Sequence, residues 1–239
     1  ELADIIKHRR LEILFQPIIA CRRGKVYGYE ALVRGPSTSP LHSPMNLFDA
    51  ALKSGCINQL DQTCRQLAIR QFKALKLKGK LFINVFPLAI VDGVSGVNEI
   101  MADLSQAGIE ASQIVIELTE QFPIDDFEVM RTAMARCREL GFSMALDDLG
   151  AGYANLRNWS ELRTDYVKID QHFIQNIDQD SDKREFVQSI LEISRRLDCA
   201  VIAEGVETLE EYRTLWSMGI EFAQGYYFGR PEAQPKGLL

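Results

Sequence analysis

The chain has 239 residues, of which 46% are hydrophobic and 25% are charged, so it is large enough to bury a core without disulfides. Its formal net charge of −6 argues against a broad contact with duplex DNA or RNA, although a metal ion in an acidic cleft would still admit a small phosphate ligand. No run reaches the ~18 apolar residues of a membrane span, so we expect no membrane contact by this domain.

Short apolar runs alternate with longer amphipathic stretches along the whole chain. Each run is rich in Val, Ile or aromatic residues and has the length of a strand, which is typical of buried strands. A segment rich in Pro, Gly and Ser, Gly35–Pro44, is interpreted as a loop. The predicted strands are Ile13–Ala20, Lys25–Val33, Lys80–Phe86, Gln113–Leu118, Phe142–Leu146, Tyr166–Ile169, Ala200–Ala203 and Phe222–Phe228.

Apolar residues at helical spacing lie between these runs. The predicted helices include Leu60–Leu77, Phe127–Leu140 and Lys183–Leu197. Asp125 and Ser181 are candidate N-caps, because their side chains can accept hydrogen bonds from the first free N–H groups of a helix. Gly141 stands where a glycine commonly ends a helix.

Eight strands alternating with helices predict an α/β fold, a TIM-like (β/α)8 barrel. The first two strands are joined only by Cys21–Gly24, which is too short for a parallel crossover, so we expect an antiparallel first strand. An open doubly wound sheet is the alternative, but the chain contains no G-x-G-x-x-G or Walker A pattern to support nucleotide binding there.

Polar residues recur at the carboxyl ends of the predicted strands. Carboxylates are rarely buried without a partner, and strand ends converge on the rim of a barrel where such enzymes carry out their chemistry. We therefore interpret the set as one site. Its members are Glu30, Asn84, Glu117, Asp147, Asp148, Lys168, Asp170, Glu204 and Gln224.

The residue types at this rim favour a particular class of metal. Several carboxylates with an amide and no nearby histidine provide oxygen ligands, which suit Mg²⁺ or Mn²⁺ better than Zn²⁺. The adjacent pair Asp147 and Asp148 is suited to holding two ions, one carboxylate bridging, and such pairs assist in-line displacement at phosphorus. Lys168 would add a positive charge for a phosphate or a water molecule.

Other chemistries fit the sequence less well. His8, His42 and His172 do not pair with a Ser or Cys nucleophile motif, and no G-x-S-x-G occurs, so we expect them to be solvated or locally bonded. A glycosidase could use two of the acids, but it would not need Asn84, Lys168 and further carboxylates. The five cysteines are odd in number and lack C-x-x-C spacing, which indicates buried, unreactive thiols and a cytoplasmic location.

Eight short motifs follow one another along the chain. They are Phe15–Ile18, Glu30–Arg34 (EALVR), Asn84–Val85, Glu117–Glu120 (ELTE), Asp147–Tyr153 (DDLGAGY), Lys168–Asp170 (KID), Ala203–Thr208 (AEGVET) and Gln224–Tyr226. In this order they resemble the motifs of the EAL-domain phosphodiesterases, a family that hydrolyses the second messenger cyclic-di-GMP. The similarity covers about Leu11 to Pro231, and its specificity comes from several motifs occurring in the family's order.

The resemblance implies a role for each matching position. It implies metal ligands at Glu30, Asn84, Glu117, Asp147 and Asp148 and catalytic roles for Glu204, Lys168 and Asp170. Substrate contacts would come from Gln16, Leu32, Arg34, Glu207 and Gln224, and Glu120 would anchor the loop after the Asp pair. The implied reaction is metal-dependent hydrolysis of cyclic-di-GMP to linear pGpG. It would use two Mg²⁺ or Mn²⁺ ions, and Ca²⁺ would inhibit it.

The resemblance also carries expectations about assembly. It implies a homodimer with its interface near Asp148–Trp159. It also implies flanking sensory or GGDEF-type domains, so that residues 1–239 would be a single EAL domain excised from a longer signalling protein. Two positions depart from the family pattern, Leu149 in place of Phe and Phe86 in place of Ser, and neither removes a ligand. A receptor that binds cyclic-di-GMP without hydrolysing it, and a hydrolase for another phosphodiester, remain as alternatives.

Overall fold

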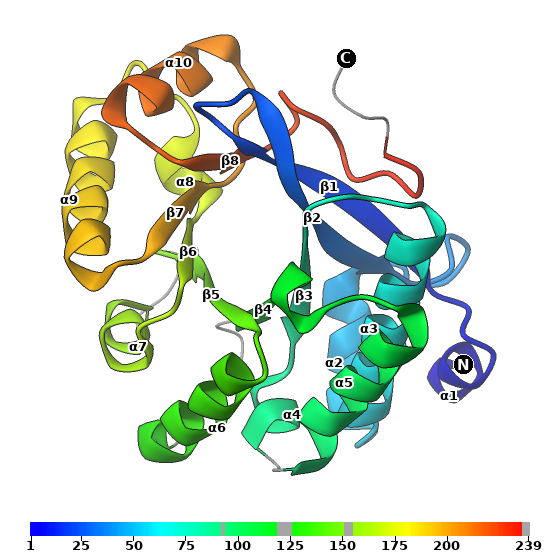
Figure 1. Cartoon of the computed structure of the whole chain (residues 1–239). Coiled ribbons are helices and arrows are strands. Elements are labelled where there is room, and N and C mark those ends of the chain that lie inside the picture. Colours follow the sequence, from blue (N-terminus) through cyan, green and yellow to red (C-terminus); the bar gives the residue numbers. More distant parts are fainter. Residues whose placement is uncertain (92–93, 119–125, 151–154, 236–239) are drawn as a thin grey trace.

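The computed structural model describes residues 1–91, 94–118, 126–150 and 155–235, and its centre is a closed barrel of eight strands that follow one another in chain order (Figure 1). The strands are β1 (Glu12–Ala20), β2 (Lys25–Arg34), β3 (Lys80–Val85), β4 (Ile114–Leu118), β5 (Ser143–Leu149), β6 (Tyr166–Ile169), β7 (Ala200–Ala203) and β8 (Phe222–Gln224).

Strand direction confirms the predicted irregular barrel. β1 is antiparallel to both of its neighbours, β2 and β8, whereas the other adjacent pairs from β2 to β8 are parallel. The short link Cys21–Gly24 forms the expected hairpin, in which the N–H groups of Arg23 and Gly24 both donate to the carbonyl of Ala20. Closure of the sheet excludes the open doubly wound alternative.

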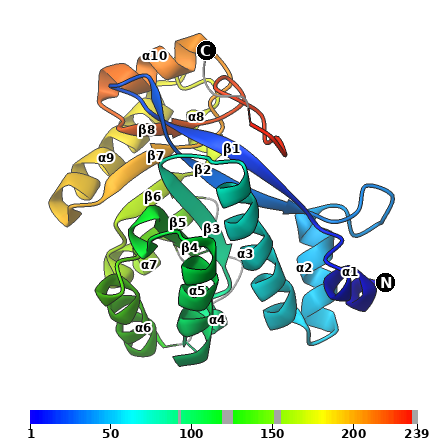
Figure 2. The ribbon, with the colours of Figure 1, turned by 45° about the vertical axis from the view of Figure 1, so that its right-hand side comes forward.

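Helices surround the barrel on its outer side (Figures 1 and 2). They are α1 (Leu2–Lys7), α2 (Pro44–Lys53), α3 (Ile57–Ala74), α4 (Pro87–Val91), α5 (Val94–Ala107), the 3-10 turn η1 (Ala111–Gln113), α6 (Phe127–Glu139), α7 (Asn155–Leu162), α8 (Gln171–Ile174), α9 (Ser181–Leu197) and α10 (Leu209–Met218). No helix in the described part of the chain is both long and apolar enough to cross a membrane.

Helix ends correct several expected boundaries. α3 begins and ends three residues earlier than expected. It ends at Ala74 because Lys76 adopts a left-handed φ of 55° and the N–H of Leu77 donates back to Phe72. Asp126 caps α6, whereas the candidate Asp125 lies outside the described residues. Ser181 is the first residue of α9 and not its cap, because the Asp180 side chain accepts the free N–H groups. Gly141 ends α6 as predicted.

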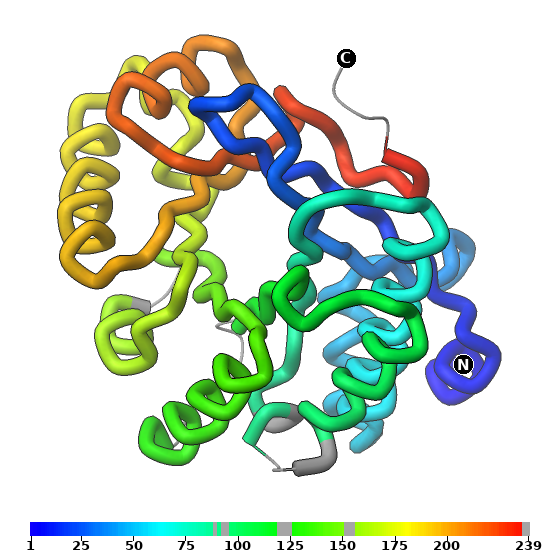
Figure 3. Tube along the Cα trace, viewed as in Figure 1, coloured from blue at the N-terminus to red at the C-terminus, as the bar shows by residue number. Residues whose placement is uncertain are grey.

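Two strand ends also differ from expectation. β5 continues to Leu149, so that both members of the Asp147 and Asp148 pair lie within the strand. β8 ends at Gln224 and not at Phe228, because the chain turns at Gly225, whose carbonyl accepts from the N–H groups of Phe228 and Gly229. The segment that follows returns beside β1, where Phe15 and Glu232 exchange two backbone hydrogen bonds (Figure 3).

The barrel interior consists of two layers that follow from the alternation of side chains along a strand. The lower layer is apolar and contains Ile18, Phe82, Val115, Ala145, Tyr166 and Ile202. Two residues further along the chain, within β3 to β6 and directly after β7, the polar residues are Asn84, Glu117, Asp147, Lys168 and Glu204. The apolar layer therefore forms the floor under a polar layer that opens towards the carboxyl ends of the strands.

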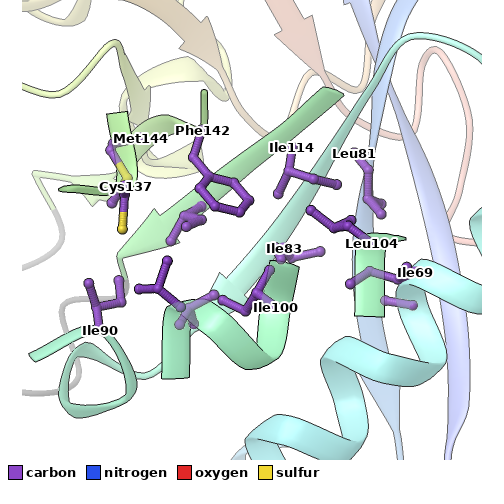
Figure 4. Packing of buried hydrophobic residues seen from close by; sticks show 14 of the residues in the cluster. Ile69, Leu81, Ile83, Ile90, Ile100, Leu104, Ile114, Cys137, Phe142 and Met144 are labelled. Atoms are coloured by element: carbon purple, nitrogen blue, oxygen red, sulfur yellow. The ribbon is translucent and has the colours of Figure 1, made fainter. Parts of the chain in front are cut away.

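The outer faces of the strands pack against the helices. Figure 4 shows side chains of α3, α5, β3, β4 and β5 gathered in one of these clusters, which includes Ile69, Ile83 and Ile100. A second cluster joins β6 and β7 to α9 around Val187 and Ile190. This double coverage explains the nearly continuous apolar character of the parallel strands.

The five residues of the polar layer include no cysteine or histidine. All five cysteines are free, and Cys21, Cys137 and Cys199 are buried, but Cys56 and Cys64 are only half-buried, which corrects the expectation for these two. Burial raises the pKa of Cys137 to about 11, so its thiol is unreactive at neutral pH. Nδ1 of His42 bonds locally to the carbonyl of Gly35, as expected.

Candidate metal and substrate site

The ammonium of Lys168 lies at the centre of the polar layer. Its Nζ is 2.8 Å from Glu204, 2.9 Å from Asp147, 3.0 Å from Glu117 and 3.2 Å from Glu30. Lys168 is 1% exposed and Glu117 is 0% exposed, so these charges are removed from bulk water. Four carboxylates around one ammonium leave an excess of negative charge, which additional cations can neutralise.

Side-chain amides hold the carboxylates of Glu30 and Glu117 in place. Nδ2 of Asn84 donates to Glu30 and to Glu117, each at 3.3 Å. Nε2 of Gln224 donates to Glu30 at 2.6 Å and to Oε1 of Gln16 at 3.0 Å. The residues predicted from β1, β2, β3, β4 and β8 thus form one connected hydrogen-bond network.

Two groups of carboxylates in the described part of the chain are close enough to hold cations. One consists of Glu30, Glu117 and Asp147, the other of Asp147, Asp148 and Glu204, and within each group the ligand oxygens lie within 4.8 Å of one another. Asp147 belongs to both groups, as a bridging carboxylate must. All of these donors are oxygens, which suits Mg²⁺ or Mn²⁺.

The state of the buried oxygens agrees with a cation site. Oε1 of Glu117 and Oδ1 of Asp147 are buried and have the Lys168 ammonium as their polar neighbour, which leaves lone pairs for a further cation. The donor set therefore fits two divalent ions.

An irregularity in β5 allows two consecutive residues to serve one site. Successive side chains of a regular strand point to opposite faces, so Asp147 and Asp148 would normally diverge. Asp148 instead has a φ of 55°, and the pairing of β5 with β6 shifts between Leu146 and Leu149. This left-handed residue brings its carboxylate to the same side as that of Asp147, and such strained positions cluster at functional sites.

Burial and mutual repulsion raise the pKa values of Glu204 and Asp148 in the second group. Burial raises the pKa of the Glu204 carboxyl well above its ordinary value, and the nearby charge of Asp147 adds to this effect. Burial, followed by repulsion from Asp147, raises the pKa of Asp148 to about 6. A proton and a cation therefore compete for this group at mildly acidic pH.

In the first group, the surroundings raise the pKa of Glu117 and lower the pKa of Glu30. Burial, with repulsion from Glu30 and Asp147, raises the pKa of Glu117 well above its ordinary value. Burial acts in the same direction on Glu30, but the Lys168 charge and hydrogen bonds from Gln224 and Asn84 outweigh it and lower the pKa of Glu30. Burial would lower the pKa of Lys168, but the surrounding carboxylates raise it, so its amine stays protonated.

Two cavities meet above the carboxylates. One of about 300 Å³ is lined by Gln16, Asp170, Glu204, Glu207, Gln224 and Tyr226, among others. The other, of about 240 Å³, is lined by Arg34, Met45, Phe48, Asp61, Arg65 and Phe86, among others. Glu30, Leu32, Asp147 and Asp148 line both, so the candidate ion sites lie between two adjoining spaces.

Close backbone contacts shape the larger cavity. A Cβ at Gly205 would lie 2.4 Å from Cβ of Gln171, and Gly205 has a φ of 71°. A Cβ at Gly225 would lie 2.1 Å from the carbonyl oxygen of Val206. Only glycine fits at these two positions, which is why the loops after β6, β7 and β8 can approach one another beside Glu204 and Gln224.

Most predicted site residues are brought together, with three qualifications to their placement. Glu30 lies inside β2 and not at its end, because β2 continues to Arg34, which pairs with Glu12 of β1. Asp170 lines the larger cavity, but its Oδ1 also accepts the N–H of His172 as the cap of α8. Glu120 lies outside the described residues.

The sequence interpretation missed a buried ion pair beside the smaller cavity. Asp61 and Arg65, 3% and 4% exposed, form an ion pair within α3, and Oδ1 of Asp61 accepts the N–H of Phe86 at 3.2 Å. Burial lowers the pKa of Arg65 to about 10, although Glu99 and Asp103 act in the opposite direction. The sequence did contain an indication of this pair, because opposite charges four residues apart interrupt the apolar face of α3.

Two curated relatives cover nearly the whole chain. It is 34% identical over 235 residues to the cyclic di-GMP phosphodiesterase NbdA of Pseudomonas aeruginosa, which covers 97% of this chain and 30% of NbdA. It is 30% identical over 217 residues to the blue light- and temperature-regulated antirepressor BluF of Escherichia coli, covering 90% of this chain and 53% of BluF. The chain thus spans 30% of the length of NbdA and about half of the length of BluF.

Solved structures show the same barrel. The calcium/cyclic-di-GMP complex of BlrP1 from Klebsiella pneumoniae is similar to this chain with a TM-score of 0.86 and 31% identity, over 96% of this chain and 58% of BlrP1. The sequence model of the EAL domain matches residues 1–231. The chain therefore belongs to the EAL domain family.

Proposed function

We propose that this chain is a metal-dependent phosphodiesterase that hydrolyses cyclic-di-GMP to linear pGpG. The observation that carries the proposal is the pair of carboxylate groups that share Asp147 at the junction of two cavities. Similarity to NbdA and to the cyclic-di-GMP complex of BlrP1 supports the substrate. The chain spans only part of these proteins. The activity of any longer protein that contains this domain is therefore also a proposal.

Mg²⁺ or Mn²⁺ is the cofactor that the donor set favours. Glu30, Asn84, Glu117 and Asp147 would hold one ion, and Asp147, Asp148 and Glu204 the other. When bound, the two ions supply positive charge for an in-line displacement at phosphorus and favour ionisation of a water molecule.

The residues around the ions have complementary tasks. In the hydrolysis, a water oxygen forms a bond to phosphorus, the bond from phosphorus to the 3′ oxygen breaks, and that oxygen takes up a proton. Glu204, whose pKa is raised by burial, is suited to accept the proton of the water molecule. Lys168 stays charged and orients the surrounding carboxylates, and Asp170 would position the water molecule from the larger cavity.

The two cavities would accommodate the substrate on either side of the ions. Gln16, Glu207 and Gln224 line the larger cavity, and Arg34 lines the smaller one, while Leu32 contributes to both. The guanidinium of Arg34 can engage two oxygens of a phosphate or a base at once. A small cyclic dinucleotide spanning both cavities would present one of its phosphates to the ions.

A receptor without catalytic activity is the second candidate function. The observation that favours it is the similarity to BluF, whose name describes an antirepressor. The complete set of carboxylates in this chain favours the enzyme, because a receptor would not need Glu204 and Asp148 in place as well as the substrate contacts.

We also propose a homodimer in the cytoplasm with flanking regulatory domains. Leu156 of α7 is 58% exposed and lies in the segment 148–159 expected at the interface, of which residues 151–154 lie outside the described part. Sedimentation over a range of concentrations tests the dimer, and a monomer at every concentration would contradict it.

Incubation of the purified chain with cyclic-di-GMP tests the main proposal. Reactions contain Mg²⁺ or Mn²⁺, with EDTA as the control and chromatography as the readout. The proposal expects conversion to pGpG that EDTA abolishes. Binding of cyclic-di-GMP without conversion would instead support the receptor, and equal cleavage of another cyclic dinucleotide would contradict the assigned substrate.

A further inference from the structure

Glu211 of α10 is a buried acid that accepts hydrogen bonds from two loops of the site. It is 3% exposed. Its Oε2 accepts the N–H groups of Glu207 and Thr208, at 2.8 and 3.0 Å. Its Oε1 accepts the N–H of Asn176, at 2.8 Å. One carboxylate thus binds the loop after β7 and the segment after α8 together.

The first of these segments carries residues proposed for the reaction, since the loop after β7 contains Glu204 and Glu207. The second segment directly follows the short helix α8, whose N-cap is Asp170. Asn176 has a left-handed φ of 59°, a conformation that asparagine adopts more readily than most residues. The Glu211 carboxylate holds this turn through the N–H of Asn176.

The loop after β8 is hydrogen-bonded to the loop after β7. The N–H of Val206 donates to the carbonyl of Gln224, and the N–H of Tyr227 donates to the carbonyl of Val206. Val206 is fully buried, and Gly225 packs directly against its backbone. The position of Gln224 and Tyr226 therefore depends on the loop that Glu211 holds, and the loops after β7 and β8 both line the larger cavity.

We propose that Glu211 is a positioning residue that sets the geometry of the larger cavity for the cyclic dinucleotide. It lies outside the residues that line either cavity in the described part of the chain, so it acts through the backbone of Glu207, Thr208 and Asn176. The inference rests on the proposed function for the identity of the ligand. It also explains how this carboxylate can be buried, since three N–H donors compensate its charge.

Glu211 has a second, purely structural role that a control must separate. It completes a capping box with Thr208, whose Oγ1 accepts the N–H of Glu211 at 3.2 Å. Thr208→Ala removes that half of the box and weakens the start of α10, but it keeps the carboxylate and its three N–H donors. Glu211→Gln keeps the size of the side chain and replaces one accepting oxygen by a donating NH2 group.

The experiment compares wild type, Glu211→Gln and Thr208→Ala. Dissociation constants for cyclic-di-GMP are measured by calorimetry with Ca²⁺, which we expect to permit binding with little turnover, and kcat and KM are measured with Mn²⁺. Hydrogen exchange of the amides of Asn176, Glu207 and Thr208 reports on the loops without any ligand. Glu211→Asp, which keeps the charge on a shorter side chain, replaces Glu211→Gln in the comparison if the latter does not fold.

The inference predicts that Glu211→Gln weakens cyclic-di-GMP binding and accelerates exchange of the three amides, each by about tenfold or more. The rise in KM should exceed the fall in kcat, and Thr208→Ala should leave KM within about twofold of wild type at a similar loss of thermal stability. Unchanged binding and exchange in Glu211→Gln, or an equal loss in Thr208→Ala, would overturn it. Failure of wild type to bind or cleave cyclic-di-GMP would instead refute the proposed function, and this inference with it.

Discussion

Nζ of Lys168 lies 2.9 Å from Oδ1 of Asp147, the carboxylate that belongs to both candidate ion groups. The ammonium therefore reaches the point where the two groups meet. It also contacts Glu117 in the first group and Glu204 in the second. Lys168 thus acts as a fixed positive charge inside an acidic barrel, and its effect on stability and on chemistry can be tested separately.

Lys168→Met should destabilise the metal-free protein, because it leaves buried carboxylates without their cation. We expect a loss of about 3–5 kcal/mol in the free energy of unfolding, measured by urea denaturation in EDTA. Mn²⁺ should restore part of this loss. Lys53→Met, at an ion pair with a side chain 79% exposed, is the control and should change little. Equal stability of the two variants would contradict the assignment.

Glu204→Gln should abolish turnover without unfolding the barrel. The amide cannot accept a proton from water, so we expect kcat to fall by about 10²–10⁴-fold with an unchanged circular dichroism spectrum. Glu30→Ala should act in the same direction through loss of an ion ligand. Glu210→Gln, on the exposed side of α10, is the matched control. Appreciable turnover by a folded Glu204→Gln protein would remove Glu204 from the mechanism.

Mn²⁺ affinity should fall as the pH drops below about 6, the raised pKa of Asp148. The folded metal-free protein keeps a proton on this carboxyl between its ordinary pKa of about 3.9 and this value. Its contribution to folding is therefore present at low pH and is lost as the pH rises through about 6. A cation needs the ionised form, so binding strengthens over the same interval.

Calorimetric titration of Mn²⁺ at about pH 5 and about pH 7.5 checks this expectation. Asp148→Asn removes the titrating group and should flatten the dependence, although Glu117 and Glu204, whose pKa values are also raised by burial, will leave a residual slope. The same pH dependence in wild type and Asp148→Asn would show that Asp148 does not bind the ion.

Arg65→Met should be among the most destabilising changes near the smaller cavity. It leaves the buried Asp61 carboxylate without its cation, which we expect to cost about 3–5 kcal/mol in thermal or chemical unfolding. Combining it with Asp61→Asn should recover part of the loss, because the amide oxygen can still accept the N–H of Phe86. A double variant no more stable than Arg65→Met would argue against a charge effect.

The barrel could be predicted from the sequence because its strands are short, apolar and separated by helices. The antiparallel β1 followed from the length of the Cys21–Gly24 link alone. Strand ends were less predictable. Nothing in the run Phe142–Leu146 indicates that β5 extends to Leu149, because the extension depends on a left-handed Asp148 that only the surrounding barrel can impose.

The site could be predicted as a set of residue types but not as a network. Carboxylates after successive strands indicated one rim, and family motifs added Gln16 and Glu207. The sequence could not show that Lys168 would contact four carboxylates, because those contacts join β2, β4, β5, β6 and the end of β7. The contacts of Asp61 with the N–H of Phe86 and of Glu211 with the N–H of Asn176 could not be predicted, because each joins segments that are distant in the sequence.

Counting bound Mn²⁺ tests the central claim most directly. The claim is that two ions bind, with Glu117 specific to one group and Asp148 to the other. In the absence of cyclic-di-GMP, which Mn²⁺ would turn over, calorimetry should give two Mn²⁺ per wild-type chain and one per chain for Glu117→Gln and for Asp148→Asn. A single ion in wild type, or two ions retained in both variants, would contradict the account.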